Sequence, residues 1–324
     1  MIISRTPYRV SFAGGGTDLP AFYRDEPGAV LSVAIKKHMH VTVHRRFEPT
    51  TRVAYSQTEI VEDFRDLQHD LVREAIRWTG IEEPLEITTI GDVPAGTGMG
   101  SSSSLAAGLL SALYAYKGQL FSAERIARES CILELDVLNK PIGRQDQYAA
   151  AFGGLNYIQF MPDHTVRVEP VPCRAEVLTE LERRTLLLYT GQTRSADKIL
   201  SRQSDATKAN RRILRKMRDL ADEMRHTLAG HGDLDSFARL LHVAWELKRQ
   251  QGCGISNERI DGWYDMARKL GATGGKLLGA GGGGFLLLLA PPERHAAIVE
   301  ALGSPRQLDF RIDPHGSRCV FVEN

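Results

Sequence analysis

A run of small residues, Gly96-Thr-Gly-Met-Gly-Ser-Ser-Ser-Ser104, stands between a strand-like segment at 85–90 and a helix-like segment at 105–116. Glycine at every second position lets the backbone come close to a ligand, because no Cβ atom stands in the way. The serines fall where a helix leaves its first N–H groups unpaired and where its dipole is positive. Such a junction is suited to binding phosphate. The sequence therefore predicts a nucleotide site in a chain that mixes strands and helices.

Two familiar phosphate loops do not fit this run. A Walker A loop needs Gly-Lys followed by Ser or Thr, and no lysine lies within residues 91–115. In the dinucleotide-binding fingerprint the third glycine comes three places after the second, whereas Gly98 is followed by Gly100. Taken alone, the run is equally consistent with a strand–glycine–helix junction that binds nothing. Other features of the chain have to decide.

Length and composition are those of an ordinary globular protein. At 324 residues two domains are expected, and 42% hydrophobic with 25% charged residues is typical of a globular enzyme. The net charge of +1 argues against a nucleic-acid partner. We expect no membrane partner, since the chain has neither a membrane-length apolar run nor a signal peptide. Four scattered cysteines, expected to be reduced thiols, favour a cytoplasmic location.

The periodicity of apolar residues predicts the following elements. Strands are expected at 8–13, 29–35, 39–45, 85–90, 156–160, 166–168, 185–189, 285–289 and 319–322. Helices are expected at 64–78, after Ser122 as far as residue 137, and at 196–229, 236–250 and 258–270, with one more before the last strand. Gly80 is expected to cap the first of these helices. The second half, from about residue 170, is thus the helix-rich one.

Glycine clusters occur three times, at 14–16, 96–100 and 279–284, which suggests several loops closing on one ligand. With these clusters in view, the chain resembles the GHMP kinase superfamily over essentially its whole length. The matching motifs, in family order, are Pro7-Tyr-Arg-Val-Ser-Phe-Ala-Gly-Gly-Gly-Thr-Asp18, Asp92-Val-Pro-Ala-Gly-Thr-Gly-Met-Gly-Ser-Ser102, Gly143-Arg-Gln-Asp-Gln-Tyr148 and Lys276-Leu-Leu-Gly-Ala-Gly-Gly-Gly-Gly284.

The resemblance implies an α+β fold of two domains with the active site between them. An N-terminal GHMP domain, expected over residues 1–170, would hold the phosphate loop in a βαβ unit. A C-terminal GHMP domain, expected over residues 171–324, would be helix-rich and ferredoxin-like. The oligomeric state is left open.

The resemblance also implies an ATP- and Mg²⁺-dependent kinase. Ala13-Gly-Gly-Gly-Thr-Asp18 and Gln145-Asp-Gln-Tyr-Ala-Ala-Ala-Phe-Gly-Gly154 are most similar to the sugar 1-kinases that act on D-glycero-D-manno-heptose 7-phosphate. The expected reaction phosphorylates its anomeric hydroxyl to the 1,7-bisphosphate. Gly15 and Gly16 stand where galactokinases have Glu and His, which argues against galactose and leaves room for a bulkier sugar. The alternatives are a kinase for another sugar such as L-fucose, a family member that carries out a decarboxylation or acts on a mevalonate-like alcohol, or a non-catalytic relative that senses sugar and ATP.

The resemblance assigns the nucleotide and the metal to the phosphate loop and one carboxylate. The nucleotide-binding residues are expected to be Gly96, Thr97, Gly98, Met99, Gly100, Ser101, Ser102 and Ser103. Ser102 and Glu134 are expected to bind Mg²⁺, which prefers oxygen ligands. Glu134 lies twelve positions before Asp146, as the corresponding residues do in galactokinase-like relatives. A solvated helix carboxylate is the alternative for Glu134.

Asp146 is the expected catalytic group, either as a base for the acceptor hydroxyl or as a group that orients it. Arg9 is expected beside it, where a guanidinium would balance charge on the transferred phosphoryl group. The expected substrate-binding residues are Gly15, Gly16, Thr17, Asp18, Asp146, Arg194, Gly281 and Gly282. Arg194 ranks first among the cations that could meet a phosphate on the sugar, ahead of Arg144 and Lys198. The alternatives are a turn residue for Asp146, a surface cation for Arg9, and a turn or helix cap for Asp18.

Overall fold

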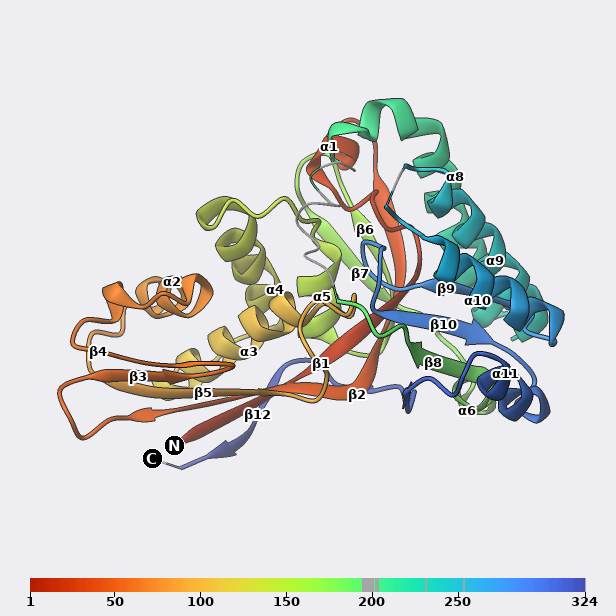
Figure 1. Cartoon of the computed structure of the whole chain (residues 1–324). Coiled ribbons are helices and arrows are strands. Elements are labelled where there is room, and N and C mark those ends of the chain that lie inside the picture. The colour runs from red at the N-terminus through yellow and green to blue at the C-terminus, as the bar shows by residue number, and fades with distance from the viewer. Residues whose placement is uncertain (194–200, 202–203, 231, 253, 324) are drawn as a thin grey trace.

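Two sheets with helices packed against them make up the described chain (Figure 1). A computed structural model describes residues 1–193, 201, 204–230, 232–252 and 254–323. The strands are β1 (Ile2–Ala13), β2 (Gly28–Arg45), β3 (Thr51–Ala54), β4 (Thr58–Val61), β5 (Leu85–Gly91), β6 (Leu155–Phe160), β7 (Val166–Pro170), β8 (Thr185–Tyr189), β9 (Gly274–Leu277), β10 (Phe285–Leu289), β11 (Gln307–Leu308) and β12 (Arg318–Val322). The order in the first sheet is β12-β1-β2-β5-β3-β4, with β6 and β7 branching from β2, and in the second it is β11-β8-β10-β9.

The helices pack against these two sheets. The described helices are α1 (Pro20–Tyr23), α2 (Asp70–Thr79), α3 (Ser101–Tyr116), α4 (Ala123–Cys131), α5 (Gln145–Phe152), α6 (Ala175–Arg184), α8 (Thr207–Ala229), α9 (Leu234–Arg249), α10 (Glu258–Lys269) and α11 (His295–Ala301). A π-helical segment, η2 (Ile132–Val137), continues α4, and 3₁₀ turns lie at Phe64–Asp66 and Pro292–Arg294. No described helix has the length and apolar character that crossing a membrane would require.

β1 and β2 form the long antiparallel ladder of the first sheet. Their register passes from Pro7 opposite His38 directly to Tyr8 opposite Ile35, so two residues of β2 bulge out. Pro7 has no N–H to donate to the ladder, and such positions are where bulges occur. The strands expected at 29–35 and 39–45 are therefore one bulged strand, because the polar residues between them mark a bulge and no turn.

α3 lies against β1 and β2, and it continues directly from the phosphate loop. Twelve of its sixteen residues are buried, as expected of a helix that is apolar around its whole circumference. It also contacts α2, α4 and α5, so the start of α3 is held on several sides. This packing fixes the direction of the helix end on which the phosphate loop stands.

Several sequence predictions of elements are confirmed, and others are corrected. Gly80 caps α2 in the left-handed conformation, at φ 65°, and Ser122 caps α4 by accepting the N–H of Arg125. The helix expected at 64–78 is instead a 3₁₀ turn followed by α2. The β3–β4 hairpin, α5, α6 and β9 were not predicted; β3, β4 and β9 have only four residues each, and α5 has a weak apolar period. The helix expected at 196–229 is described at residues 201 and 204–229, which include α8. Residues 194–200, with Lys198 among them, and 202–203 lie outside the described residues.

The end of the chain returns to the first sheet. β12 pairs antiparallel with β1, and Ile312 forms a bridge with Ile35 of β2. The chain thus forms the two-part α+β fold of the prediction, with a C-terminal antiparallel sheet covered by helices. The division at residue 170 stays a prediction, because segments on its C-terminal side also complete the first sheet.

Candidate active site

The three glycine clusters meet at one cavity of about 450 Å³. Gly15 and Gly16 line it from the loop after β1, and Gly279 from the loop after β9. The phosphate loop contributes Gly96, Gly98, Gly100 and the serines Ser101, Ser102 and Ser103. The prediction that separate glycine loops close on one place therefore agrees with the geometry.

Close backbone contact explains the glycines of the second and third loops. A Cβ atom on Gly279 would lie 2.3 Å from the Cα of Gly98, and one on Gly284 would lie 2.3 Å from the carbonyl oxygen of Thr97. Both distances are shorter than non-bonded atoms allow. Gly98 also has φ 81°, in the left-handed region that favours glycine. The third loop thus holds the phosphate loop in place through its backbone.

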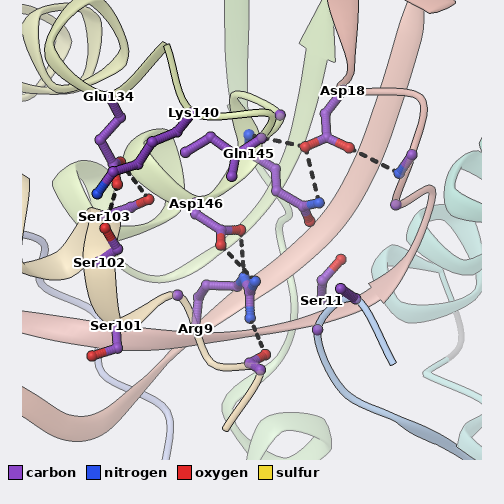
Figure 2. Close-up of a pocket in the computed structure, with 18 of the residues that line it drawn as sticks. Arg9, Ser11, Asp18, Ser101, Ser102, Ser103, Glu134, Lys140, Gln145 and Asp146 are labelled. Atoms are coloured by element: carbon purple, nitrogen blue, oxygen red, sulfur yellow. Dashed lines mark hydrogen bonds and ion pairs between the residues drawn. The ribbon is translucent and has the colours of Figure 1, made fainter. Parts of the chain in front are cut away.

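Arg9 and Asp146 form a bidentate ion pair beside the phosphate loop (Figure 2). Nε and Nη2 of Arg9 donate to the two carboxylate oxygens of Asp146, each at 2.7 Å. Nη1 of the same guanidinium donates to the carbonyl of Gly98 at 2.6 Å. Asp146 lies in the first turn of α5, where the helix dipole favours a carboxylate. One arginine thereby links the predicted catalytic carboxylate to the predicted nucleotide loop.

Glu134 is fully buried on η2 and faces the serines at the start of α3. It accepts hydrogen bonds from Ser102 at 2.5 Å, from Ser103 at 2.7 Å and from the amide of Gln147 at 2.7 Å. Burial raises the pKa of Glu134, and these donors together with nearby Lys140 oppose the rise. The solvated helix carboxylate that was the alternative for Glu134 does not agree with this position. π-helical segments are frequent at functional sites, and here one turns Glu134 inward.

The donor set around Glu134 fits a magnesium ion. Mg²⁺ takes oxygen ligands and needs only one or two protein groups beside phosphates and waters. Ser102 and Glu134 supply a hydroxyl and a carboxylate that already lie within hydrogen-bond distance of each other. In the described part of the chain, no group of three or more His, Cys, Asp or Glu residues could hold a metal. A site completed by nucleotide phosphates needs no such group.

Asp18 lies on the other side of Asp146 from Glu134 (Figure 2). It accepts from the backbone N–H of Gly16 at 2.9 Å and from the side-chain amide of Gln145 at 3.0 Å. Burial, and after it the Asp146 carboxylate, raises the pKa of Asp18. A Cβ atom on Gly143 would lie 1.8 Å from the Asp18 carboxylate, so glycine is required there. Asp18 and Asp146 thus line the same cavity as Glu134.

Some predicted residues lie behind the cavity surface. The Thr17 hydroxyl is buried and donates to the carbonyls of Gly14 and Ala29, so it shapes the loop. The residues among the predicted set that do not line the cavity are Thr17, Thr97, Met99, Gly281 and Gly282. Thr97 and Met99 are buried within the phosphate loop, and the N–H of Gly282 donates to the carbonyl of Ile255. The structure gives these five a role in holding the loops. Arg194 lies outside the described residues.

Several cavity residues were missed from the sequence. Lys140, Lys248, Lys276, Ser11, Gln145 and Gln251 all line the cavity. Lys248 continues the apolar stripe of α9, coming four residues after Ala244 and seven after Leu241. A lysine in register with a buried stripe was the available signal, whereas the sequence pattern was used only to predict a helix at 236–250. Lys276 opens the third glycine motif, but the motif alone gives this lysine no role.

Comparison with protein families gives two matches. The model of the GHMP kinases N terminal domain matches residues 67–154, and that of the GHMP kinases C terminal domain matches residues 212–305. The two lie in family order and together span more than half of the chain. The cavity residues of the phosphate loop, Glu134 and Asp146 all fall within the first match.

Individual relatives cover nearly the whole chain. A D-glycero-alpha-D-manno-heptose 7-phosphate kinase of Campylobacter jejuni is 29% identical over 93% of each chain. A bifunctional fucokinase/GDP-fucose pyrophosphorylase of Arabidopsis thaliana is also 29% identical, over 85% of this chain and 28% of the relative. Among solved structures, a D-glycero-D-manno-heptose 1-phosphate kinase from Bacteroides thetaiotaomicron has a TM-score of 0.82 at 25% identity and covers 100% of both chains.

Proposed function

The chain belongs to the GHMP kinases, phosphotransferases with an alcohol group as acceptor, and from this premise we propose that it is a sugar 1-kinase. In this proposal ATP is the phosphoryl donor and the acceptor is the anomeric hydroxyl of D-glycero-D-manno-heptose 7-phosphate. The product is the 1,7-bisphosphate.

The Arg9–Asp146 pair is the observation that carries the proposal. A Cβ atom on Gly100 would be 3.3 Å from both Arg9 Cγ and an Asp146 carboxylate oxygen, so the pair touches the last residue before α3. The start of α3 suits the donor phosphates, and Asp146 is then the carboxylate beside the group to be transferred. A kinase needs a carboxylate at this place, whereas a sensor that only binds sugar and ATP does not.

In the proposed reaction the acceptor oxygen forms a bond to the γ-phosphorus while the bond from that phosphorus to the β–γ bridging oxygen breaks, and ADP leaves. Asp146 accepts a hydrogen bond from the acceptor hydroxyl and either takes its proton or orients it so that solvent does. Arg9 holds both oxygens of Asp146 and brings positive charge to the transferred group. Bound by Ser102 and Glu134, Mg²⁺ would neutralise charge on the donor phosphates.

The choice of sugar is supported by the loop after β1. Gly15 and Gly16 line the cavity without side chains, and Asp18 presents a carboxylate beside them. The absence of side chains at these two lining positions supports an acceptor sugar larger than a hexose. The Campylobacter jejuni relative, which matches over 93% of both chains, is named for the same heptose phosphate.

L-Fucose is the second candidate acceptor. The Arabidopsis thaliana fucokinase relative is as similar in identity as the heptose kinase, although over a smaller share of this chain. L-Fucose has no phosphate group, so the two candidates differ in whether the cavity needs a second anion site.

A substrate panel tests the proposal. The purified protein is incubated with Mg-ATP and, in turn, heptose 7-phosphate, the same heptose without phosphate, L-fucose, D-galactose and mevalonate, and ADP release is measured. We expect the highest kcat/KM with heptose 7-phosphate. A higher value with L-fucose would favour the second candidate, and no turnover with any acceptor would refute the kinase proposal.

A further inference from the structure

We propose that Lys248, Lys276 and Ser11 form a second anion site in the cavity, which binds the phosphate group that the acceptor sugar itself carries. The identity of that sugar rests on the proposed function. The existence of an anion site rests on the contacts of these three residues alone.

Two buried ammonium groups without a counter-charge are the first observation. Lys248 is 6% exposed and Lys276 is 4% exposed, and both line the cavity. Lys276 donates to the carbonyls of Ser11 at 2.8 Å and Phe12 at 2.9 Å. In the described parts of the chain, no ion pair to a carboxylate is found for either lysine. Burying a cation in this way is costly unless an anion completes its surroundings.

The ammonium groups of Lys248 and Lys276 each keep one N–H donor that is not used by the carbonyls they contact. Lys248 donates to the carbonyl of Leu277 at 3.2 Å and to that of Gly279. An ammonium has three N–H donors, so the two carbonyl bonds of each lysine leave one donor free for a ligand. The Lys248 ammonium is thus held at the end of β9, and the Lys276 ammonium is held by two carbonyls of β1. Lys248 contributes to lowering the pKa of Lys276, so the two cations lie near each other in the cavity.

Ser11 supplies an independent observation. Ser11 is only 9% exposed, and its hydroxyl has no hydrogen-bond partner among the described residues. Buried hydroxyls are normally paired, so one that lines a cavity indicates a missing partner. The carbonyl of the same residue accepts from Lys276. A hydroxyl donor and an ammonium donor therefore lie together in this part of the cavity.

The lowered pKa values of Lys248 and Lys276 are consistent with an anion-binding site between or beside these two lysines. Burial, and after it Arg9, lowers the pKa of Lys248 to about 7. Burial, Lys248 and Arg9 lower the pKa of Lys276 well below its ordinary value. A phosphate group between them would oppose both shifts, because an anion favours the charged form of an amine. The site would thus gain its full positive charge when the anion binds.

The position of Ser11 favours the acceptor as the source of that phosphate. Figure 2 shows Ser102, Ser103 and Glu134 on one side of the Arg9–Asp146 pair, and Ser11 and Asp18 on the other. Arg9 and Ser11 are two residues apart on β1, which places them on one face about 7 Å apart. A sugar whose reacting hydroxyl is at Asp146 would extend from the pair toward Ser11. The donor phosphates would lie on the opposite side.

The loop after β1 that carries Gly15 and Gly16 approaches the C-terminal end of α9, the helix that carries Lys248. A Cβ atom on Gly16 would lie 3.9 Å from the side-chain oxygen of Gln251, which follows Lys248 by three residues. Gln251 lines the cavity as well. The part of the cavity beside Gly16 therefore lies near the end of α9 that carries Lys248.

Kinetics of Lys248→Met test the site. The change keeps an unbranched side chain and removes the charge. We expect KM for heptose 7-phosphate to rise about 10- to 100-fold, as for the loss of one charged hydrogen bond. KM for ATP should rise much less than KM for heptose 7-phosphate, and kcat/KM should fall much less for the heptose without phosphate than for heptose 7-phosphate. Lys269→Met, at an exposed position of α10, is the matched control and should leave all three constants unchanged.

Ser11→Ala separates binding from folding. Its hydroxyl is unpaired, so we expect no loss of thermal stability, together with a several-fold rise in KM for heptose 7-phosphate. If Lys248→Met raised KM for ATP as much as KM for heptose 7-phosphate, or lowered activity toward both forms of heptose equally, the assignment to the acceptor phosphate would be overturned. The same holds if neither variant changed KM for heptose 7-phosphate.

Binding of inorganic phosphate tests the site even if heptose 7-phosphate is not a substrate. Titration calorimetry with inorganic phosphate, in the presence of Mg-ADP to fill the nucleotide site, should give binding in the wild type and at least about 10-fold weaker binding in Lys248→Met. Equal phosphate binding by both proteins would refute the anion site. Absence of turnover with clear, Lys248-dependent phosphate binding would instead refute the proposed function and leave the site standing.

Discussion

At the scale of single residues, Asp146 is the group on which the proposed reaction depends most. Asn is nearly the same shape but cannot accept a proton, and its amide nitrogen would face the Arg9 guanidinium. We predict that Asp146→Asn lowers kcat by about 10²- to 10⁴-fold. The dissociation constant for ATP, measured by calorimetry without acceptor, should stay within about threefold, because the phosphate loop is unchanged.

Asp309→Asn removes a carboxylate at an exposed position and is the matched control. It should keep the parent turnover. An Asp146→Asn protein that released ADP at near the parent rate would show that Asp146 has no part in the chemistry.

Asp18 gives a prediction about stability and pH. Its pKa is raised by burial and then by Asp146, while the Gly16 N–H and Gln145 oppose the rise. A carboxyl with a raised folded-state pKa contributes stability that is fully present below its unfolded pKa and is lost as pH rises through the folded value. Asp18→Asn does not titrate, so its stability relative to the wild type should improve from pH 4 to pH 7.

Urea unfolding at these two pH values measures the difference. We expect the free energy of unfolding of Asp18→Asn, relative to wild type, to rise by on the order of 1 kcal/mol for each unit by which the pKa is raised. The same relative stability at both pH values would contradict the environment described for Asp18.

The sequence predicted the charged pair and Glu134 but missed the two lysines. Arg9, Asp146 and Glu134 stand in or at fixed spacing from motifs, so a resemblance could point to them. Lys248 and Lys276 are buried only because α9 and β9 pack against the end of β1. Burial of a lysine is decided by tertiary packing, and most lysines are exposed.

At the scale of elements, the contact between the glycine loops is the feature with the clearest consequence. Gly279→Ala would bring a Cβ atom to 2.3 Å from the backbone of Gly98, at a φ of 66° that already favours glycine. We predict that this change lowers the free energy of unfolding by about 2 kcal/mol or more and weakens ATP binding. Chemical denaturation and ATP titration measure the two effects.

Gly262→Ala is the control for this change. Gly262 lies inside α10, and a Cβ atom there would meet nothing within 4 Å. Alanine is the better helix former, so we expect the free energy of unfolding to rise by about 0.5–1 kcal/mol and ATP binding to stay unchanged. A Gly279→Ala protein as stable as wild type would mean that the loops do not pack as described.

Element prediction from the sequence succeeded where capping signals were strong and failed at bulges and short segments. Ser122 and Gly80 carry hydrogen-bonding or conformational information in one residue, so their helix ends were predictable. The bulge in β2 looked like the end of a strand, because a local pattern cannot show that the partner strand has a proline opposite. β9 contains two glycines in four residues and becomes a strand only beside β10.

At the scale of the whole molecule, the last strand connects the end of the chain to its start. β12 pairs with β1 from Ile2 opposite Val322 to Arg5 opposite Arg318. Ser317, just before it, lies in hydrogen-bond distance of Thr6 and Ser111. A chain ending after Gly316 would expose the edge of β1, the strand that carries Arg9. We predict that the chain ending after Gly316 has a midpoint of thermal unfolding at least several degrees below that of the full chain, as measured by calorimetry.

Val322→Thr keeps the strand and changes a side chain that is 58% exposed, so it should leave that midpoint within about 2 °C. Unchanged thermal unfolding of the shortened chain would contradict a structural role for β12. The sequence predicted this strand but could not say which sheet it joins, since strand pairing over more than 300 residues leaves no local pattern.

The position of the new phosphate in the product tests the central claim most directly. The protein is incubated with Mg-ATP and heptose 7-phosphate, and the product is analysed by phosphorus and proton nuclear magnetic resonance. The account predicts a second phosphorus signal coupled to the anomeric proton, in an amount equal to the ADP released. A phosphate on any other hydroxyl, or ADP release without a phosphorylated sugar, would contradict it.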